Sequence, residues 1–176
     1  MFSATMPPAV ERLARKYMRR PAVVTIGVAG QAVDTVEQRV EFIGSDEKKK
    51  QRLIEILNTD LYAPPIIVFV NQKRTADQLA KDVNRARVSI LPSLTGDELM
   101  LHQWRATTLH SDKNQEQREA ALASLRSGES DVLVATDLAG RGIDVSDVSL
   151  VVNYQMAKNI ESYVHRIGMS FALLPR

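Results

Sequence analysis

The chain has 176 residues, of which 44% are hydrophobic and 25% charged, with a formal net charge of +2 and no cysteine. This composition is typical of one globular domain and excludes a disordered tail, a disulfide framework and a cysteine-based zinc site. The first residues lack a positive segment followed by an apolar run, and no stretch is long enough to cross a bilayer, so we expect an intracellular, soluble protein. The small net charge neither demands nor excludes a nucleic acid partner.

The first predicted elements are a helix over residues 7–19, a strand over the alternating residues 36–43 and a helix over 46–57. One side of the first helix carries a basic stripe, which an ordinary solvated face would also explain; its residues are Arg12, Arg15, Lys16 and Arg19.

Strands and helices alternate along the rest of the chain. Strands are predicted at 66–70, 105–109, 131–135 and 149–153, and helices at 73–85, 115–125 and 159–166. The continuous apolar run from Ile66 to Val70 is typical of a strand buried on both faces. The alternation predicts an α/β fold with a doubly wound parallel sheet. Residues 88–103 fit neither period, and a connection of that length needs a special explanation.

Polar pairs follow three of the predicted strands, namely Asn71-Gln72, His110-Ser111 and Thr136-Asp137. Because open parallel sheets bind ligands at the carboxyl ends of their strands, we expect these pairs to share one edge and to mark the site. Polar loops in a generic α/β protein would explain part of this pattern.

The third pair opens the segment 136–144, which holds a hydroxyl, two carboxylates and a guanidinium among glycines. Backbone N–H groups and Arg141 suit a phosphodiester, and a carboxylate suits a ribose hydroxyl. A glycine-supported turn in which Arg141 pairs with Asp137 or Asp144 would place the same residues together.

Three further features each allow two interpretations. Gln115 and Arg118 lie one turn apart near a helix start, where a phosphate is favoured, but they also suit an exposed helix face. His165-Arg166 falls at a helix end, where both side chains commonly cap carbonyls. Trp104 could stack on a base or occupy the core or its rim.

Several kinds of site are absent from the sequence. There is no phosphate-binding loop of the form G-x-x-x-x-G-K-[ST] and no Asp-Glu-Ala-Asp carboxylate pair for magnesium. The three histidines have no metal-ligand spacing, so no metal site is predicted. The sequence therefore holds no complete catalytic centre.

Taken in order, the motifs resemble those of one family, the DEAD-box RNA helicases. The matching segments are Ser3-Ala4-Thr5 from the end of the first RecA-like domain, then 67–71, 115–118, 135–144 and 163–168 from the second. Residues 7–15 and 152–161 resemble the branch that acts at the 5′ splice site in pre-mRNA splicing. The resemblance omits only residues 88–103 and the last eight.

This resemblance implies a RecA-like second helicase domain over 36–168, with the end of the first domain and a linker in 1–35 and a non-family tail in 169–176. It also implies site roles. These are RNA contacts by Asn71, Gln115, Arg118, Thr136 and Asp137; ATP contacts by Arg141, Gly142 and Asp144; catalysis by His165 and Arg166; and an interdomain contact by Ser3, Ala4 and Thr5. Such phosphate contacts position RNA without reading its bases.

The resemblance further implies ATP with Mg²⁺, held mainly by a first domain, and single-stranded or short duplex RNA as the partner. Spliceosomal proteins as further partners, a nuclear location and a monomeric state without membrane contact follow from it as well. Two competing interpretations remain. One is a non-catalytic RNA- or protein-binding module from a truncated or misspliced product, and the other is an unrelated small-nucleotide-binding α/β domain.

Departures from the family pattern bear on activity. Met169 and Ala172 stand where the family has two arginines that stabilise the charge of phosphoryl transfer, and loss of such an arginine costs roughly three to five orders of magnitude in rate. The chain alone is therefore predicted to lack ATPase activity. Ser111 replaces a glycine beside the RNA path. The family also continues beyond this point, so we expect a sheet truncated at its C-terminal end with an unprotected edge.

The insertion suggests an origin. Arg87 would join Trp104 smoothly in the family pattern, Val88-Ser89 can be encoded by GTGAGN, and Gln103 by CAG. Residues 168–170 can likewise be written GGTATGAGT. These codons match intron boundaries, so we interpret residues 88–103 and the tail as unspliced introns. Added loop length costs little closure entropy, so the insertion should be tolerated at the edge opposite the ligands.

Overall fold

The structure is a computed structural model that describes residues 8–22, 24, 36–59, 61–89, 101–137, 143, 145 and 147–169. Its helices are α1 (Pro8–Tyr17), α2 (Asp46–Leu57), α3 (Lys73–Arg85), α4 (Gln115–Arg126) and α6 (Ile160–Ile167). Its strands are β1 (Ile66–Val70), β2 (Arg87–Ser89), β3 (Leu101–Gln103), β4 (Ala106–Leu109), β5 (Val132–Thr136) and β6 (Leu150–Asn153).

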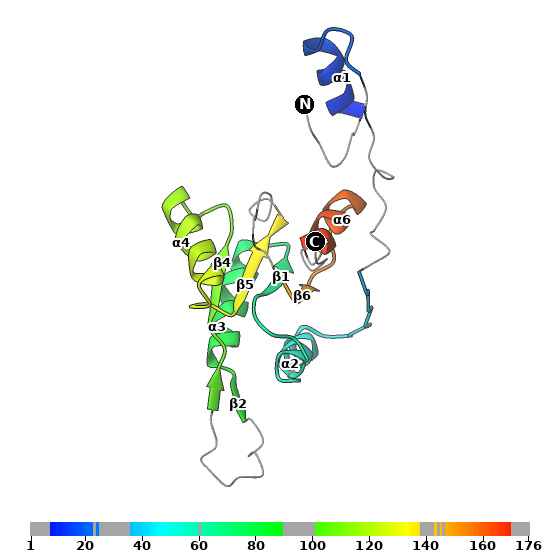
Figure 1. Cartoon of the computed structure of the whole chain (residues 1–176). Coiled ribbons are helices and arrows are strands. Elements are labelled where there is room, and N and C mark those ends of the chain that lie inside the picture. Colours follow the sequence, from blue (N-terminus) through cyan, green and yellow to red (C-terminus); the bar gives the residue numbers. More distant parts are fainter. Residues whose placement is uncertain are drawn as a thin grey trace.

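A four-stranded sheet forms the centre of the fold, with the order β4-β5-β1-β6 and all neighbours parallel. Helices flank this sheet, whereas α1 stands apart from it (Figure 1). The predicted α/β fold with a parallel sheet is confirmed, and each strand boundary lies within one residue of its predicted position.

All five side chains of β1 are fully buried, as the continuous apolar run predicted. Ile66, Val68 and Val70 belong to a core cluster shared with α2 and α3. Ile67 and Phe69 belong to a second cluster on the opposite face, shared with α4. Because successive side chains of a strand point to opposite faces, a strand covered on both sides must be apolar throughout.

Side-chain caps fix where three helices begin. The Ser45 hydroxyl accepts a hydrogen bond from the Lys48 N–H at the start of α2, and Asn159 does the same for Ser162 at the start of α6. Asn114 and Gln117 form a reciprocal capping box on α4. No described helix combines the length and the apolar character needed to cross a membrane.

The predicted strand over residues 36–43 is wrong, because this segment is extended but pairs with no strand in the described part of the chain. Alternation produces a strand only when a neighbouring strand supplies hydrogen bonds. Here Phe42 is 99% exposed. Side chains attach the segment to the domain instead: Glu41 pairs with Arg52 of α2 at 2.7 Å, and Tyr163 of α6 donates to Gln38.

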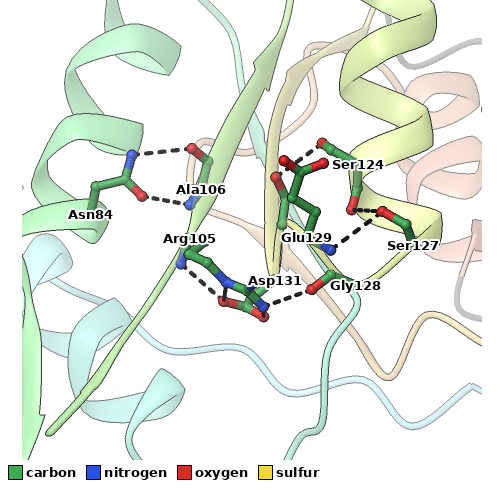
Figure 2. A network of polar contacts seen from close by, with 9 residues as sticks. Asn84, Arg105, Ala106, Ser124, Ser127, Gly128, Glu129 and Asp131 are labelled. Atoms are coloured by element: carbon green, nitrogen blue, oxygen red, sulfur yellow. Dashed lines mark hydrogen bonds and ion pairs between the residues drawn. The ribbon is translucent and has the colours of Figure 1, made fainter.

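Polar side chains tie together the amino-terminal ends of β4 and β5 (Figure 2). Asp131, which is 3% exposed, accepts hydrogen bonds from the Arg105 backbone N–H at 3.0 Å and from its guanidinium at 2.8 Å. Those bonds raise the pKa of Arg105 above its ordinary value. Asn84 of α3 donates to the Ala106 carbonyl and accepts from its N–H, like a short neighbouring strand.

Residues 88–103, the insertion, begin and end beside these polar contacts between β4 and β5. Arg87 of β2 lies directly opposite Gln103 of β3 in an antiparallel pair, and the Gln103 side chain donates to the Asn84 carbonyl. Paired Cα atoms lie about 5 Å apart and consecutive ones 3.8 Å, so residue 87 almost meets residue 104 across the base of the insertion. Trp104 itself is buried in the core and bonds Asn58, so it occupies the core position of its two interpretations.

The junction yields a stability prediction. Replacing Asp131 by Asn removes a buried carboxylate that accepts three hydrogen bonds from Arg105, and we expect the free energy of unfolding to fall by about 1.5–3 kcal/mol. Urea denaturation measures this change. Glu129→Gln, an exposed substitution in the same turn, should stay within about 0.5 kcal/mol of the wild type. Equal losses in both variants would contradict the assignment.

Candidate nucleic-acid interface

A hollow of about 660 Å³ lies at the carboxyl ends of the parallel strands. Its lining comes from the segments that follow β1, β4 and β5 and from the segment between β6 and α6. The lining residues are Asn71, Gln72, Lys73, Arg74, Ser111, Thr136, Asp137 and Lys158. All three polar pairs predicted at the strand ends contribute to it, so the strand-end rule located this hollow correctly.

A buried guanidinium holds the strand ends beneath the hollow. Arg166 of α6 is 0% exposed and donates to Asp137 after β5, to the Asn71 side chain after β1 at 3.0 Å, and to Asn153 at the end of β6 at 3.0 Å. It also donates to the Gln155 carbonyl at 2.7 Å. One side chain therefore connects the ends of three strands.

The surroundings of Arg166 bear on the catalytic role that the resemblance implies for it. Its guanidinium carbon lies 5.0 Å from the ring centroid of Phe69, which covers its face. Its N–H groups point at protein oxygens, and no part of the side chain is accessible. In this structure the Arg166 guanidinium therefore bonds protein oxygens and holds the segments that carry them, while its catalytic role stays a prediction.

Asn71 is held from several sides. Its backbone N–H donates to the Gln155 side chain at 2.7 Å, and its side-chain N–H donates to the Met156 carbonyl at 3.1 Å. Its side-chain oxygen accepts from Arg166. These bonds fasten the segment after β6 to the end of β1, and they place Lys158 at the hollow.

The hollow is lined by three cations that sequence reasoning missed, Lys73, Arg74 and Lys158. Lys73 and Arg74 begin α3 directly after Asn71-Gln72, so extending the strand-end rule by two residues would have found them. Lys158 could not be found in this way, because its position depends on how the segment after β6 folds back. Phosphate groups of a nucleic acid are the ligands that such a hollow suits.

Of the pair His110-Ser111 after β4, the first residue is buried and the second lines the hollow. His110 is 4% exposed, and its Nε2 lies 3.0 Å from a carboxylate oxygen of Asp77 in α3. That carboxylate oxygen also accepts from the Thr108 hydroxyl. Ser111 is exposed and is among the lining residues of the hollow, at the position where the family pattern has a glycine.

The predicted RNA contacts fall in two places. Thr136 and Asp137 line the hollow, although Asp137 also binds Arg166. Gln115 and Arg118 lie on the first turn of α4, outside the described lining. The Gln115 amide donates to Glu119 at 2.6 Å.

Of the predicted catalytic and finger positions, the structure describes His165 and Met169 besides Arg166. His165 is exposed on α6, and Met169 packs partly against the second core cluster. The remaining residues lie outside the described residues: Ser3, Ala4, Thr5, Arg141, Gly142, Asp144 and Ala172. Among described side chains, no group of three or more His, Asp or Glu is placed to hold a metal ion.

The fold and the hollow agree with a comparison against protein families. Residues 48–169 match the family described as the helicase conserved C-terminal domain. The chain therefore belongs to this helicase family, and it carries the family's RecA-like C-terminal domain.

Curated relatives narrow the assignment. The chain is 62% identical over 168 residues to the pre-mRNA-splicing ATP-dependent RNA helicase prp-28 of Neurospora crassa, and 66% identical to PRP28 of Cryptococcus neoformans. Each match covers 96% of this chain and 21% of the relative, so the chain spans about a fifth of those proteins. The predicted resemblance to the DEAD-box helicases of pre-mRNA splicing is confirmed.

Solved structures support the same family assignment. Prp28 of Chaetomium thermophilum bound to ADP is 55% identical, with a TM-score of 0.62 over 97% of this chain and 37% of that chain. Dbp5 of S. cerevisiae bound to RNA and ADP BeF3 is 28% identical, with a TM-score of 0.73 over 96% of this chain and 40% of that chain.

Arg166 can be tested in the free protein. Arg166→Lys keeps the charge but cannot reproduce the guanidinium's bonds to three strand ends, so we expect a loss of about 2–4 kcal/mol in the free energy of unfolding. Urea denaturation without any ligand measures it. The matched control is Arg74→Lys at an exposed position, with a change below about 0.5 kcal/mol. Unchanged stability of Arg166→Lys would rule out the positioning role.

Proposed function

We propose that this chain is the RNA-binding C-terminal half of an ATP-dependent RNA helicase of pre-mRNA splicing. The observation that carries the proposal is the hollow at the carboxyl ends of the strands, where Lys73, Arg74 and Lys158 converge with Thr136. Cations and hydroxyls at this edge suit the phosphates of a strand and leave its bases unread. RNA backbone is the ligand that best fits this lining.

The relatives' names support the substrate. The matched proteins are named ATP-dependent RNA helicases of pre-mRNA splicing, and one structural neighbour is bound to RNA and ADP BeF3. We extend these properties to the present chain as part of the proposal. In it, Gln115 and Arg118 extend the RNA contacts along α4, residues 1–35 lead from a first RecA-like domain, and the protein acts in the nucleus beside spliceosomal proteins.

ATP with Mg²⁺ would serve the two-domain enzyme. The described residues do not by themselves fit a triphosphate, because Met169 presents an apolar side chain at the predicted finger position and the Arg166 guanidinium is enclosed. We therefore assign this chain no hydrolytic step of its own. Its described residues bind and orient RNA, while the nucleotide supplies the driving force for opening short duplexes.

Met169 also favours a second candidate function. Its side chain packs against the apolar cluster that contains Phe69 and Leu125, so the finger position contributes to the core. A chain with this feature would bind RNA, or a protein partner of a helicase, without turnover. The two candidates share the RNA site and differ in ATP hydrolysis.

Binding of single-stranded RNA tests the shared site. We expect weak, sequence-independent binding whose logarithmic affinity falls linearly with the logarithm of salt concentration, because phosphate contacts release counterions. Lys158→Gln should weaken binding about threefold to tenfold and flatten the salt dependence. Fluorescence anisotropy with labelled oligouridylate and oligoadenylate measures both. Lys81→Gln on the far part of α3 removes the same charge and should change neither; equal effects of both substitutions would reject the hollow as the RNA site.

Hydrolysis separates the two candidates. With the chain joined to the first domain of a DEAD-box relative, we expect Met169→Arg with Ala172→Arg to raise RNA-stimulated ATP turnover by about three orders of magnitude or more. A coupled assay of ADP release measures turnover with and without RNA. The matched control is Met169→Lys with Ala172→Lys, which restores charge without the forked guanidinium. Turnover absent from every version would favour the binding module.

A further inference from the structure

One cation of the hollow is neutralised, unlike its neighbours. The Lys73 ammonium lies 2.7 Å from one carboxylate oxygen of Asp112 and 2.9 Å from the other. Arg74 and Lys158 form no ion pair with a described residue. Lys73 begins α3, whereas Asp112 lies in the turn after β4, so the contact bridges two segments that meet at the hollow.

The pair is open to solvent and to an incoming ligand. The Lys73 side chain is 51% exposed and the Asp112 side chain 54% exposed. Lys73 lines the hollow beside Ser111, the residue preceding Asp112. The Lys73 ammonium also lowers the pKa of Asp112, so the carboxylate stays charged and holds the lysine at neutral pH.

A phosphodiester oxygen is chemically close to this carboxylate. Both are anionic oxygens that accept charge-assisted hydrogen bonds from an ammonium group, so they compete for the same N–H donors. Asp112 also places a negative charge beside Lys73 and Ser111, two residues that line the hollow. The carboxylate therefore opposes RNA binding in two ways, by occupying Lys73 and by repelling phosphate.

We infer that Asp112 occupies the phosphate-binding Lys73 in the free protein, so that RNA reaches Lys73 by displacing the carboxylate. This inference rests on the proposed RNA-binding function and deepens it. The opposite arrangement, in which Asp112 holds Lys73 in place for RNA, predicts changes of the opposite sign. The sign of one substitution therefore separates the two.

The expected effect follows from the strength of an exposed ion pair. Removing the competing charge should tighten RNA binding about twofold to fivefold. It should also steepen the salt dependence. In the wild type, Lys73 releases a counterion from RNA, but the displaced Asp112 carboxylate takes up a cation from solution, so the two changes cancel. Without that carboxylate, only the release remains. A single-stranded phosphate contact contributes about 0.7 to that slope.

The test uses the full 176-residue chain and a fluorescein-labelled oligouridylate of about ten nucleotides, with anisotropy recorded from about 50 to 200 mM salt. We expect Asp112→Asn to bind more tightly with a steeper slope and Lys73→Gln to bind more weakly with a shallower slope. In the Lys73→Gln background, Asp112→Asn should keep only the smaller part of the gain that comes from relieved repulsion. Asp82→Asn is the matched control, because it breaks a partly exposed lysine pair about 14 Å along α3 and should leave binding unchanged.

Two results would overturn the inference. One is a weaker or unchanged affinity of Asp112→Asn, and the other is the same gain from Asp112→Asn in the Lys73→Gln background. Asp112→Ser, with circular dichroism to verify folding, serves as a second variant if the asparagine protein does not fold. No binding of the probe by the folded wild type would instead reject the proposed function itself.

Discussion

The buried guanidinium of Arg166 is the interaction on which the carboxyl edge of the sheet depends. Parallel strands end here with polar side chains that would otherwise move independently, and one residue of α6 joins those of β1, β5 and β6. Burying a charge is costly unless partners surround it, and here four protein oxygens and the ring of Phe69 do so. Because Arg166 fixes these strand-end residues, it also fixes the positions of the residues that line the hollow.

The opposite edge is organised differently. Asn84 and Asp131 bind backbone groups of Ala106 and Arg105, so they satisfy the hydrogen-bonding groups at these strand ends. Polar residues at this edge close the sheet, whereas those at the carboxyl edge leave three cations open to solution. The same sheet thereby has one edge suited to a ligand and one suited to structural additions.

Local patterns predicted most of the fold, and long-range contacts account for what they missed. Periodicity gave the bounds of α2 and β1 because their burial follows from a regular pattern on short segments. Residues 36–43 alternate equally well but pair with no described strand, and alternation carries no information about a partner. The strand-end rule located Thr136 at the hollow. It could not show that Arg166 is enclosed, since sequence spacing does not reveal which side of a helix another strand end covers.

The insertion between β2 and β3 has a consequence for studying the molecule. Its two ends pair as β2 and β3 beside Asn84, next to the amino-terminal end of β4, whereas the hollow lies at the carboxyl ends of the strands (Figure 1). A fluorophore or a small reporter domain inserted between residues 89 and 101 would join the domain at the β2–β3 pair. A label at this position can therefore report on RNA binding while the residues that line the hollow stay unmodified.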